Sequence, residues 1–180
     1  MLSHSWVPEA KVKENREHLD WIGLEKEGRL TIVDGPYVDY TLVMQWFLEQ
    51  QEKYRIDTIG YDPAKAVFLV RELQQRGFVL NEVRQGELTL TAPMDNLKER
   101  FLDGNIVHNN DRLFRWYLGN VKLTKRGANA TYLPTKQNRA RKIDGFAALL
   151  CAHTEYMRRN AFAITPDKKL SRVISLGRKR

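Results

Sequence analysis

The feature that most constrains the fold is a strand–helix–strand pattern between residues 56 and 83. Apolar residues over 56–61, and again over 78–83, are typical of buried strands. The helix expected between them covers 63–76 and is closed by Gly77. Strands joined in this way form a βαβ unit, in which they run parallel with a right-handed crossover. The sequence therefore predicts an α/β fold with the 56–61 strand central and next to the 78–83 strand.

The other expected elements follow from helical periodicity, strand alternation and turn signals. They are strands over 1–7 and 30–33, a turn region over 21–28, helices over 8–20, 40–54, 93–103, 111–118 and 143–159, and one or two strands within 119–134. A chain of 180 residues with this pattern is one domain that can bury a proper core. The basic tail over 165–180 is expected to be loose.

The chain is basic, with a net charge of +8 that favours a polyanionic partner, although solubility alone also explains such an excess. Its single cysteine, Cys151, excludes an internal disulfide and a cysteine zinc cluster, and fits a reducing compartment. No apolar run reaches transmembrane length and no signal peptide opens the chain, so we expect no membrane partner. No glycine-rich phosphate loop occurs, which argues against an ATPase site in these residues.

Two carboxylates are expected at the ends of elements, Asp62 after the 56–61 strand and Asp144 at the start of the last helix. Helix capping explains each of them, because Asp is favoured at N-caps and near the positive end of the helix dipole. In an α/β fold, whose sites gather at the carboxyl ends of strands, the same two acids also suit a divalent cation. If they share one, their carboxylates should lie roughly 4–8 Å apart.

A run of basic residues without any acid precedes Asp144. It contains Lys122, Lys125, Arg126, Lys136, Arg139, Arg141 and Lys142. A solvated face usually mixes charges of both signs, so this run predicts contacts to DNA phosphates, with an exposed basic loop as the alternative. His108, in an expected extended piece, is assigned to the same DNA-binding surface, although a lone loop histidine is more often plain polar surface.

Several stretches share the order and spacing of one family. They are Trp6-Val7-Pro8-Glu9, Val38-Asp39-Tyr40, Ile59-Gly60-Tyr61-Asp62-Pro63, Asn105-Ile106-Val107-His108, Trp116 with Asn120, Lys136, and Lys142-Ile143-Asp144-Gly145 followed by Ala147 and Leu149. From about residue 4 to residue 157, the chain resembles the nuclease domain of tailed-phage terminase large subunits.

The resemblance implies an RNase H-like mixed sheet flanked by helices over residues 1–164. It implies an Mg²⁺- or Mn²⁺-dependent, two-metal endonuclease that cuts concatemeric double-stranded viral DNA during packaging, in the cytoplasm of the bacterial host. Two of the family's acids map onto Asp62 and Asp144, as catalytic residues and metal ligands. The terminase small subunit and the portal or procapsid are the partners it implies besides DNA.

The chain departs from the family pattern at its start. The family's first acid lies on an opening strand, which is lacking here, as is the ATPase domain that precedes it in the family. We therefore expect an N-terminally incomplete domain with a weakened metal site and an exposed sheet edge. Two other functions stay open: a non-catalytic DNA-binding module whose acids are only caps, and a capsid- or portal-docking module from a prophage remnant.

Overall fold

The computed structural model describes residues 1–64, 66–126, 131–138 and 141–176. Its elements run in the order β1 (Ser5–Pro8), α1 (Glu9–Glu14), α2 (Trp21–Lys26), β2 (Leu30–Val33), α3 (Tyr40–Lys53), β3 (Ile59–Tyr61), α4 (Val67–Gln75), β4 (Leu80–Glu82), α5 (Glu87–Leu102), α6 (Arg112–Gly119), β5 (Val121–Arg126), β6 (Thr131–Lys136) and α7 (Asp144–Leu176). No helix within these ranges has both the length and the apolar character needed to cross a membrane.

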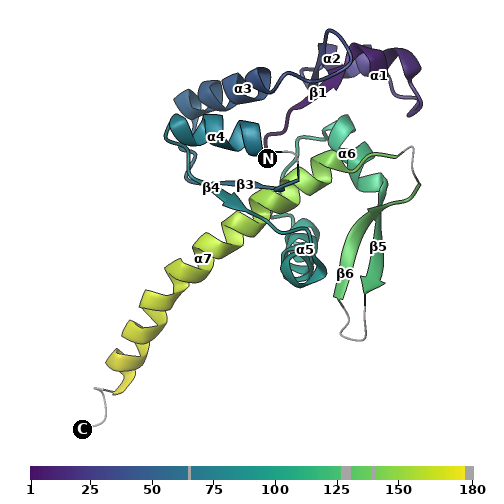
Figure 1. Ribbon diagram of the computed structural model, residues 1–180. Coiled ribbons are helices and arrows are strands. Elements are labelled where there is room, and N and C mark those ends of the chain that lie inside the picture. The colour runs from purple at the N-terminus through teal and green to yellow at the C-terminus, as the bar shows by residue number, and fades with distance from the viewer. Residues whose placement is uncertain (65, 127–130, 139–140, 177–180) are drawn as a thin grey trace.

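The described strands form three two-stranded sheets, shown in Figure 1. β1 pairs with β2 and β3 pairs with β4, both in parallel, while β5 and β6 are antiparallel. The pairing of Ile59 with Leu80 and of Tyr61 with Glu82 confirms the predicted βαβ unit. The predicted central position of the 56–61 strand is wrong, because among the described residues β3 pairs with β4 alone. The α/β class is therefore confirmed, with the strands divided among small sheets that helices flank.

Two clusters of buried side chains form the core. The first joins the residue after β4 to α5 and α7, and its buried members are Val83, Leu90, Met94, Leu97, Phe146, Leu150 and Cys151. The second joins β1, α2, β2 and α6, and consists of Val7, Trp21, Leu24, Leu30, Leu113 and Tyr117. α7 and α6 contact each other, so the two clusters meet where the last helix begins.

The helix expected over 8–20 is shorter than predicted, because Asn15 ends it. Asn15 has φ 36° and ψ 46°, the left-handed conformation in which a helix stops. Its side-chain oxygen accepts hydrogen bonds from the Leu19 amide and from the Trp21 indole, which hold the following loop. The expected turn region over 21–28 contains α2 instead, whose first turn is capped by the carboxylate of Asp20.

The helix expected over 93–103 begins six residues earlier, at Glu87. Pro93 is the first residue of the expected span, and a first-turn position is where a proline's missing N–H costs nothing. It lies inside α5 instead, between the buried side chains of Leu90 and Met94. Burial of this face, continued by Leu97, compensates for the backbone hydrogen bond that a proline removes.

The last helix is much longer than the predicted span of 143–159. α7 continues to Leu176, so residues 165–176 are helical where a loose tail was expected. Figure 1 shows the second half of α7 projecting away from the other elements. Residues 177–180 of that tail lie outside the described residues.

Candidate functional site

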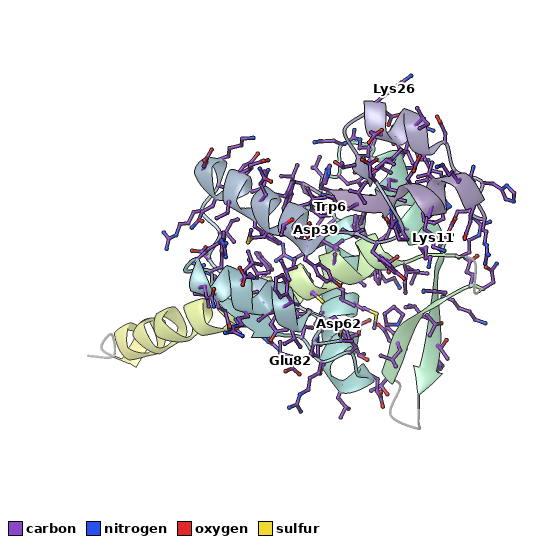
Figure 2. The ribbon with its side chains drawn as sticks, turned by 45° about the horizontal axis from the view of Figure 1, so that its top comes forward. Trp6, Lys11, Lys26, Asp39, Asp62 and Glu82 are labelled. Atoms are coloured by element: carbon purple, nitrogen blue, oxygen red, sulfur yellow. The ribbon has the colours of Figure 1, made fainter. Side chains whose placement is uncertain are left out.

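Asp62 follows directly after β3, at the carboxyl end of the strand, as predicted. Its Oδ1 accepts a hydrogen bond from the amide of Ala64 at 2.9 Å, which turns the chain before α4. The N-cap of α4 is Ala66 and α4 begins at Val67, so Asp62 is not the N-cap of that helix. The side chain is exposed, beside the end of β4 at Glu82 (Figure 2), which leaves its second oxygen available to a ligand.

Asp144 is the first residue of α7 and is also exposed. The loop before it is held by Asn120, a buried residue whose Nδ2 donates to the Lys142 carbonyl at 2.8 Å. The next residue, Gly145, lies so close to the ring of Tyr117 that a Cβ at that position would be 2.3 Å from Cδ2 of the ring. These contacts fix the start of α7 against α6 and so set the position of Asp144.

Both acids lie near the same helix, α7. Burial is the main cause that raises the pKa of the Cys151 thiol, and the charges of Asp62 and Glu155 raise it further, while a hydrogen bond from Gln85 lowers it. Asp62 is therefore an electrostatic neighbour of Cys151. Cys151 lies two helical turns after Asp144, roughly 10 Å along the helix axis. The shared-cation distance between the two carboxylates remains a prediction.

The chemistry of Asp62 and Asp144 suits a hard cation, because both side chains offer exposed carboxylate oxygens. Within the described ranges, however, no group of three or more His, Cys, Asp or Glu side chains gathers so that it could hold a metal ion. A cluster of two cations needs more ligands than Asp62 and Asp144 provide. The described residues therefore do not make a complete two-metal centre.

The basic residues lie on a hairpin and on the loop that leads to α7. Lys122, Lys125 and Lys136 are exposed on β5 and β6, while Arg141 and Lys142 are partly buried. The antiparallel register puts Lys125 and Lys136 on one face of the hairpin and Lys122 on the other. The side chain of Arg126 and the whole of Arg139 lie outside the described part of the chain. The run is therefore divided between two faces, which its order in the sequence does not show.

His108 is a packing residue in this structure. Its ring lies 5.8 Å from that of Phe114 and 6.4 Å from that of Phe101, measured between centroids. Its Nδ1 is buried and has no hydrogen-bond partner among the described residues. A contact of His108 with DNA stays a prediction that these contacts do not support.

Sequence reasoning missed Glu155, a buried acid on α7 that is 4% exposed. Its carboxylate accepts from Asn81 Nδ2 at 2.6 Å and from Arg158 Nη1 at 2.5 Å, so it ties α7 to β4. Glu155 follows Cys151 by four residues and so lies on the apolar face of the helix, which was the available signal that this acid is buried. Gly60 was noted only as part of a motif, although it is where β3 packs on the same stretch of α7.

The parallel βαβ unit with its flanking helices defines an α/β domain, in agreement with the RNase H-like fold that the resemblance implies. A carboxylate follows its strand, and a second one opens the long helix that packs on that strand. The chain belongs to the family "Terminase large subunit, endonuclease domain", whose model matches residues 1–160.

Two individual proteins are similar to this chain. Protein YmfN of Escherichia coli (strain K12) is 26% identical over 157 residues, which cover 82% of this chain and 34% of YmfN. The crystal structure of the HK97 bacteriophage large terminase superposes with a TM-score of 0.73 at 20% identity, covering 83% of this chain and 32% of that one. The chain thus spans about a third of the length of both relatives.

Proposed function

We propose that this chain is the divalent-metal-dependent endonuclease domain of a phage DNA-packaging terminase, which cleaves concatemeric double-stranded viral DNA. Its membership of the terminase endonuclease family supports the reaction class. The single observation that carries the site is the pair of exposed carboxylates at the end of β3 and at the start of α7. The proposal places this reaction in the cytoplasm of the bacterial host, with the terminase small subunit and the portal or procapsid as further partners.

In this proposal Asp62 and Asp144 are catalytic residues that would hold Mg²⁺ or Mn²⁺ through their carboxylate oxygens. When bound in a two-metal centre, such cations activate a water molecule and stabilise the leaving oxygen of a phosphodiester. The chain's own contribution is rigid placement. Asn120 holds the loop before α7, and the close contact of Gly60 with α7 sets Asp62 against the same helix.

The basic residues supply the contacts to DNA. Lys125 and Lys136 project from one face of the hairpin, so together they can contact phosphates of one duplex without reading bases. Lys142 and Arg141 continue the basic surface to the start of α7, next to Asp144. This arrangement leads a duplex from the hairpin toward the proposed site.

Nicking of supercoiled plasmid DNA with added Mn²⁺ tests the proposal. The parent should nick the plasmid, and Asp62→Asn or Asp144→Asn should each remove that activity, because each change removes an anionic ligand. Asp103→Asn is the matched control, since Asp103 is an exposed acid at the C-terminal end of α5 and should leave nicking unchanged. Equal nicking by the parent and both site variants would refute the roles of Asp62 and Asp144.

A second candidate function is non-catalytic DNA binding, and the exposed lysines of the hairpin favour it. This function predicts salt-dependent binding to all duplexes without any Mn²⁺-dependent cutting. The same plasmid assay, combined with a binding isotherm, separates the two functions. Binding without nicking by the folded parent would replace the nuclease proposal with this one.

A further inference from the structure

Glu155 is a buried carboxylate that the proposed reaction does not use. It lies on α7, about three helical turns after Asp144, and is 4% exposed. Its Oε2 accepts a hydrogen bond from Nδ2 of Asn81 at 2.6 Å, and its Oε1 accepts one from Nη1 of Arg158 at 2.5 Å. The same Nη1 also donates to the carbonyl of Glu82, at 3.2 Å. The buried charge is therefore satisfied on both oxygens, and its partners connect α7 to β4.

The helix that carries Glu155 also positions both candidate metal ligands. Asp144 is the first residue of α7, and Asp62 follows β3, which packs on α7 at Gly60. In the β3–β4 ladder, Asn81 is the residue paired with Gly60. The hydrogen bond between Asn81 and Glu155 therefore joins α7 to the strand position beside Gly60, and through it to the strand that places Asp62.

The other contacts between α7 and these strands resist sliding along the helix axis only weakly. Apolar packing is non-directional, and at Gly60 the strand has no side chain that could interlock with the helix. The ion pair of Arg159 with Asp57 is partly exposed to solvent, where such pairs contribute little. Gln85 donates to the sulfur of Cys151, which is a weak acceptor. A hydrogen bond to a buried carboxylate is both stronger and more directional than these contacts.

We propose that Glu155 is a positioning residue, which fixes where β3 and β4 lie along α7 and so holds Asp62 and Asp144 at the separation that a shared cation needs. This inference rests on the proposed function. A buried ionic group adds little net stability compared with apolar groups of the same shape, and its best-attested use is to fix register. A slip of one residue along a helix is about 1.5 Å, and a misplacement of about 1 Å can lower activity by about 100-fold.

Exchanging the donor and the acceptor between residues 81 and 155 tests this role. Asn81→Asp alone puts a second carboxylate against Glu155, and the repulsion should displace β4 along α7. In the swap variant, Asn81→Asp combined with Glu155→Gln, the new amide nitrogen can donate to the new carboxylate. The new amide oxygen can still accept from Arg158. The swap variant keeps the charge of the pair and should behave like the parent.

An apolar pair of substitutions separates positioning from stability. Asn81→Leu combined with Glu155→Met replaces both side chains by apolar ones of similar shape, so the melting midpoint should stay within about 5 °C of the parent's. The directional contact is lost, so the position of β4 along α7 should change. Thr154→Val is the matched control, because Thr154 is buried on the same helix but its hydroxyl donates to the Leu150 carbonyl and not to a strand.

The first measurement is a distance in the metal-free protein, by pulsed electron paramagnetic resonance on the full 180-residue chain. Spin labels are attached at Arg84→Cys, just after β4, and at Ala148→Cys on α7, which are both exposed positions. Cys151→Ala removes the native thiol in every sample. The parent, the swap variant and Thr154→Val should give the same narrow distribution of distances. Asn81→Asp and the apolar pair should shift or broaden it by about 2 Å or more.

The second measurement is the dissociation constant for Mn²⁺, by isothermal titration calorimetry of the unlabelled proteins. Asn81→Asp and the apolar pair should raise this constant by about ten-fold or more, because the two carboxylates no longer meet at one cation. The swap variant and Thr154→Val should keep the parent's value. A residue that only stabilised the fold would lower the melting midpoint and leave this constant unchanged.

Three outcomes would overturn the proposal. One is a label distance that neither Asn81→Asp nor the apolar pair alters. Another is an Mn²⁺ dissociation constant that both of these variants keep at the parent's value. The third is a swap variant that restores neither the distance nor the constant. An absence of Mn²⁺ binding by the parent would instead refute the proposed metal site, and the label distances would still decide whether Glu155 fixes the position of the strands along α7.

Discussion

Replacing Gly60 by alanine probes the contact that sets β3 against α7. A Cβ at this position would lie 2.5 Å from the carbonyl oxygen of Cys151 and 2.8 Å from Cγ of Glu155. The first of these atoms belongs to the backbone of a long helix, so it cannot move aside without moving α7. Gly60→Ala should therefore separate β3 from α7 and disturb the placement of Asp62 relative to Asp144.

The magnitude follows from two opposing effects. Overpacking of a well-filled interior costs about 1–3 kcal/mol. Replacing glycine by alanine also restricts the unfolded chain, which returns about 0.4–1 kcal/mol. The net loss in the free energy of unfolding should be about 1–2 kcal/mol. For a domain of this size that corresponds to a melting midpoint lowered by roughly 2–8 °C.

Thermal and urea unfolding, followed by circular dichroism, measure this change. Gly119→Ala is the matched control, because a Cβ on this last residue of α6 meets no atom within 4 Å. It should raise stability by about 0.5–1 kcal/mol, since alanine favours a helix over glycine. A Gly60→Ala protein that melts at or above the parent's midpoint would refute the close packing of β3 on α7.

Two further predictions concern pH and salt. Burial lowers the pKa of His153, and the charge of Arg100 lowers it further, so this histidine is held neutral in the folded state and its stabilising contribution is complete above about pH 6.5. The urea midpoint of the parent should fall as the pH drops below that value, and the midpoint of His153→Gln should fall less. The variant keeps a smaller fall that comes from His4, whose pKa is also lowered by burial. A fall of equal size in parent and variant would contradict this assignment. For DNA, Lys125→Gln and Lys136→Gln should each reduce the slope of log affinity against log salt by about one unit for every duplex tested, and unchanged slopes would remove this face of the hairpin from the interface.

The sequence predicted the parts of the fold that depend on local pattern. The βαβ unit was legible because apolar runs flank a helix that ends at Gly77, and β3 and β4 do pair in parallel. α2 was missed because a six-residue helix that contains Gly23 carries little periodicity, although the Asp20 cap and the buried pair Trp21 and Leu24 were signals. The predicted start of α5 was wrong because burial of the helix in the core outweighed the preference of Pro93 for a first turn.

The sequence predicted on which strand end and helix start the candidate site residues lie, but it did not predict their neighbours in three dimensions. Asp62 lies at a strand end and Asp144 at a helix start, as expected. The role of Glu155 depends on its hydrogen bonds with Asn81 and Arg158, and Asn81 comes from a strand distant in the sequence. The two faces of the hairpin depend on strand register, which sequence order does not reveal.

The central claim is that Asp62 and Asp144 together hold a divalent cation, and melting curves with and without Mn²⁺ test it most directly. A cation that binds the folded state at 100 times its dissociation constant stabilises it by about 2.7 kcal/mol. The parent's midpoint should therefore rise by roughly 5–11 °C in saturating Mn²⁺, as should that of Asp103→Asn. Asp62→Asn and Asp144→Asn should lose most of that rise. An equal rise in the parent and in both site variants would show that these carboxylates are not metal ligands.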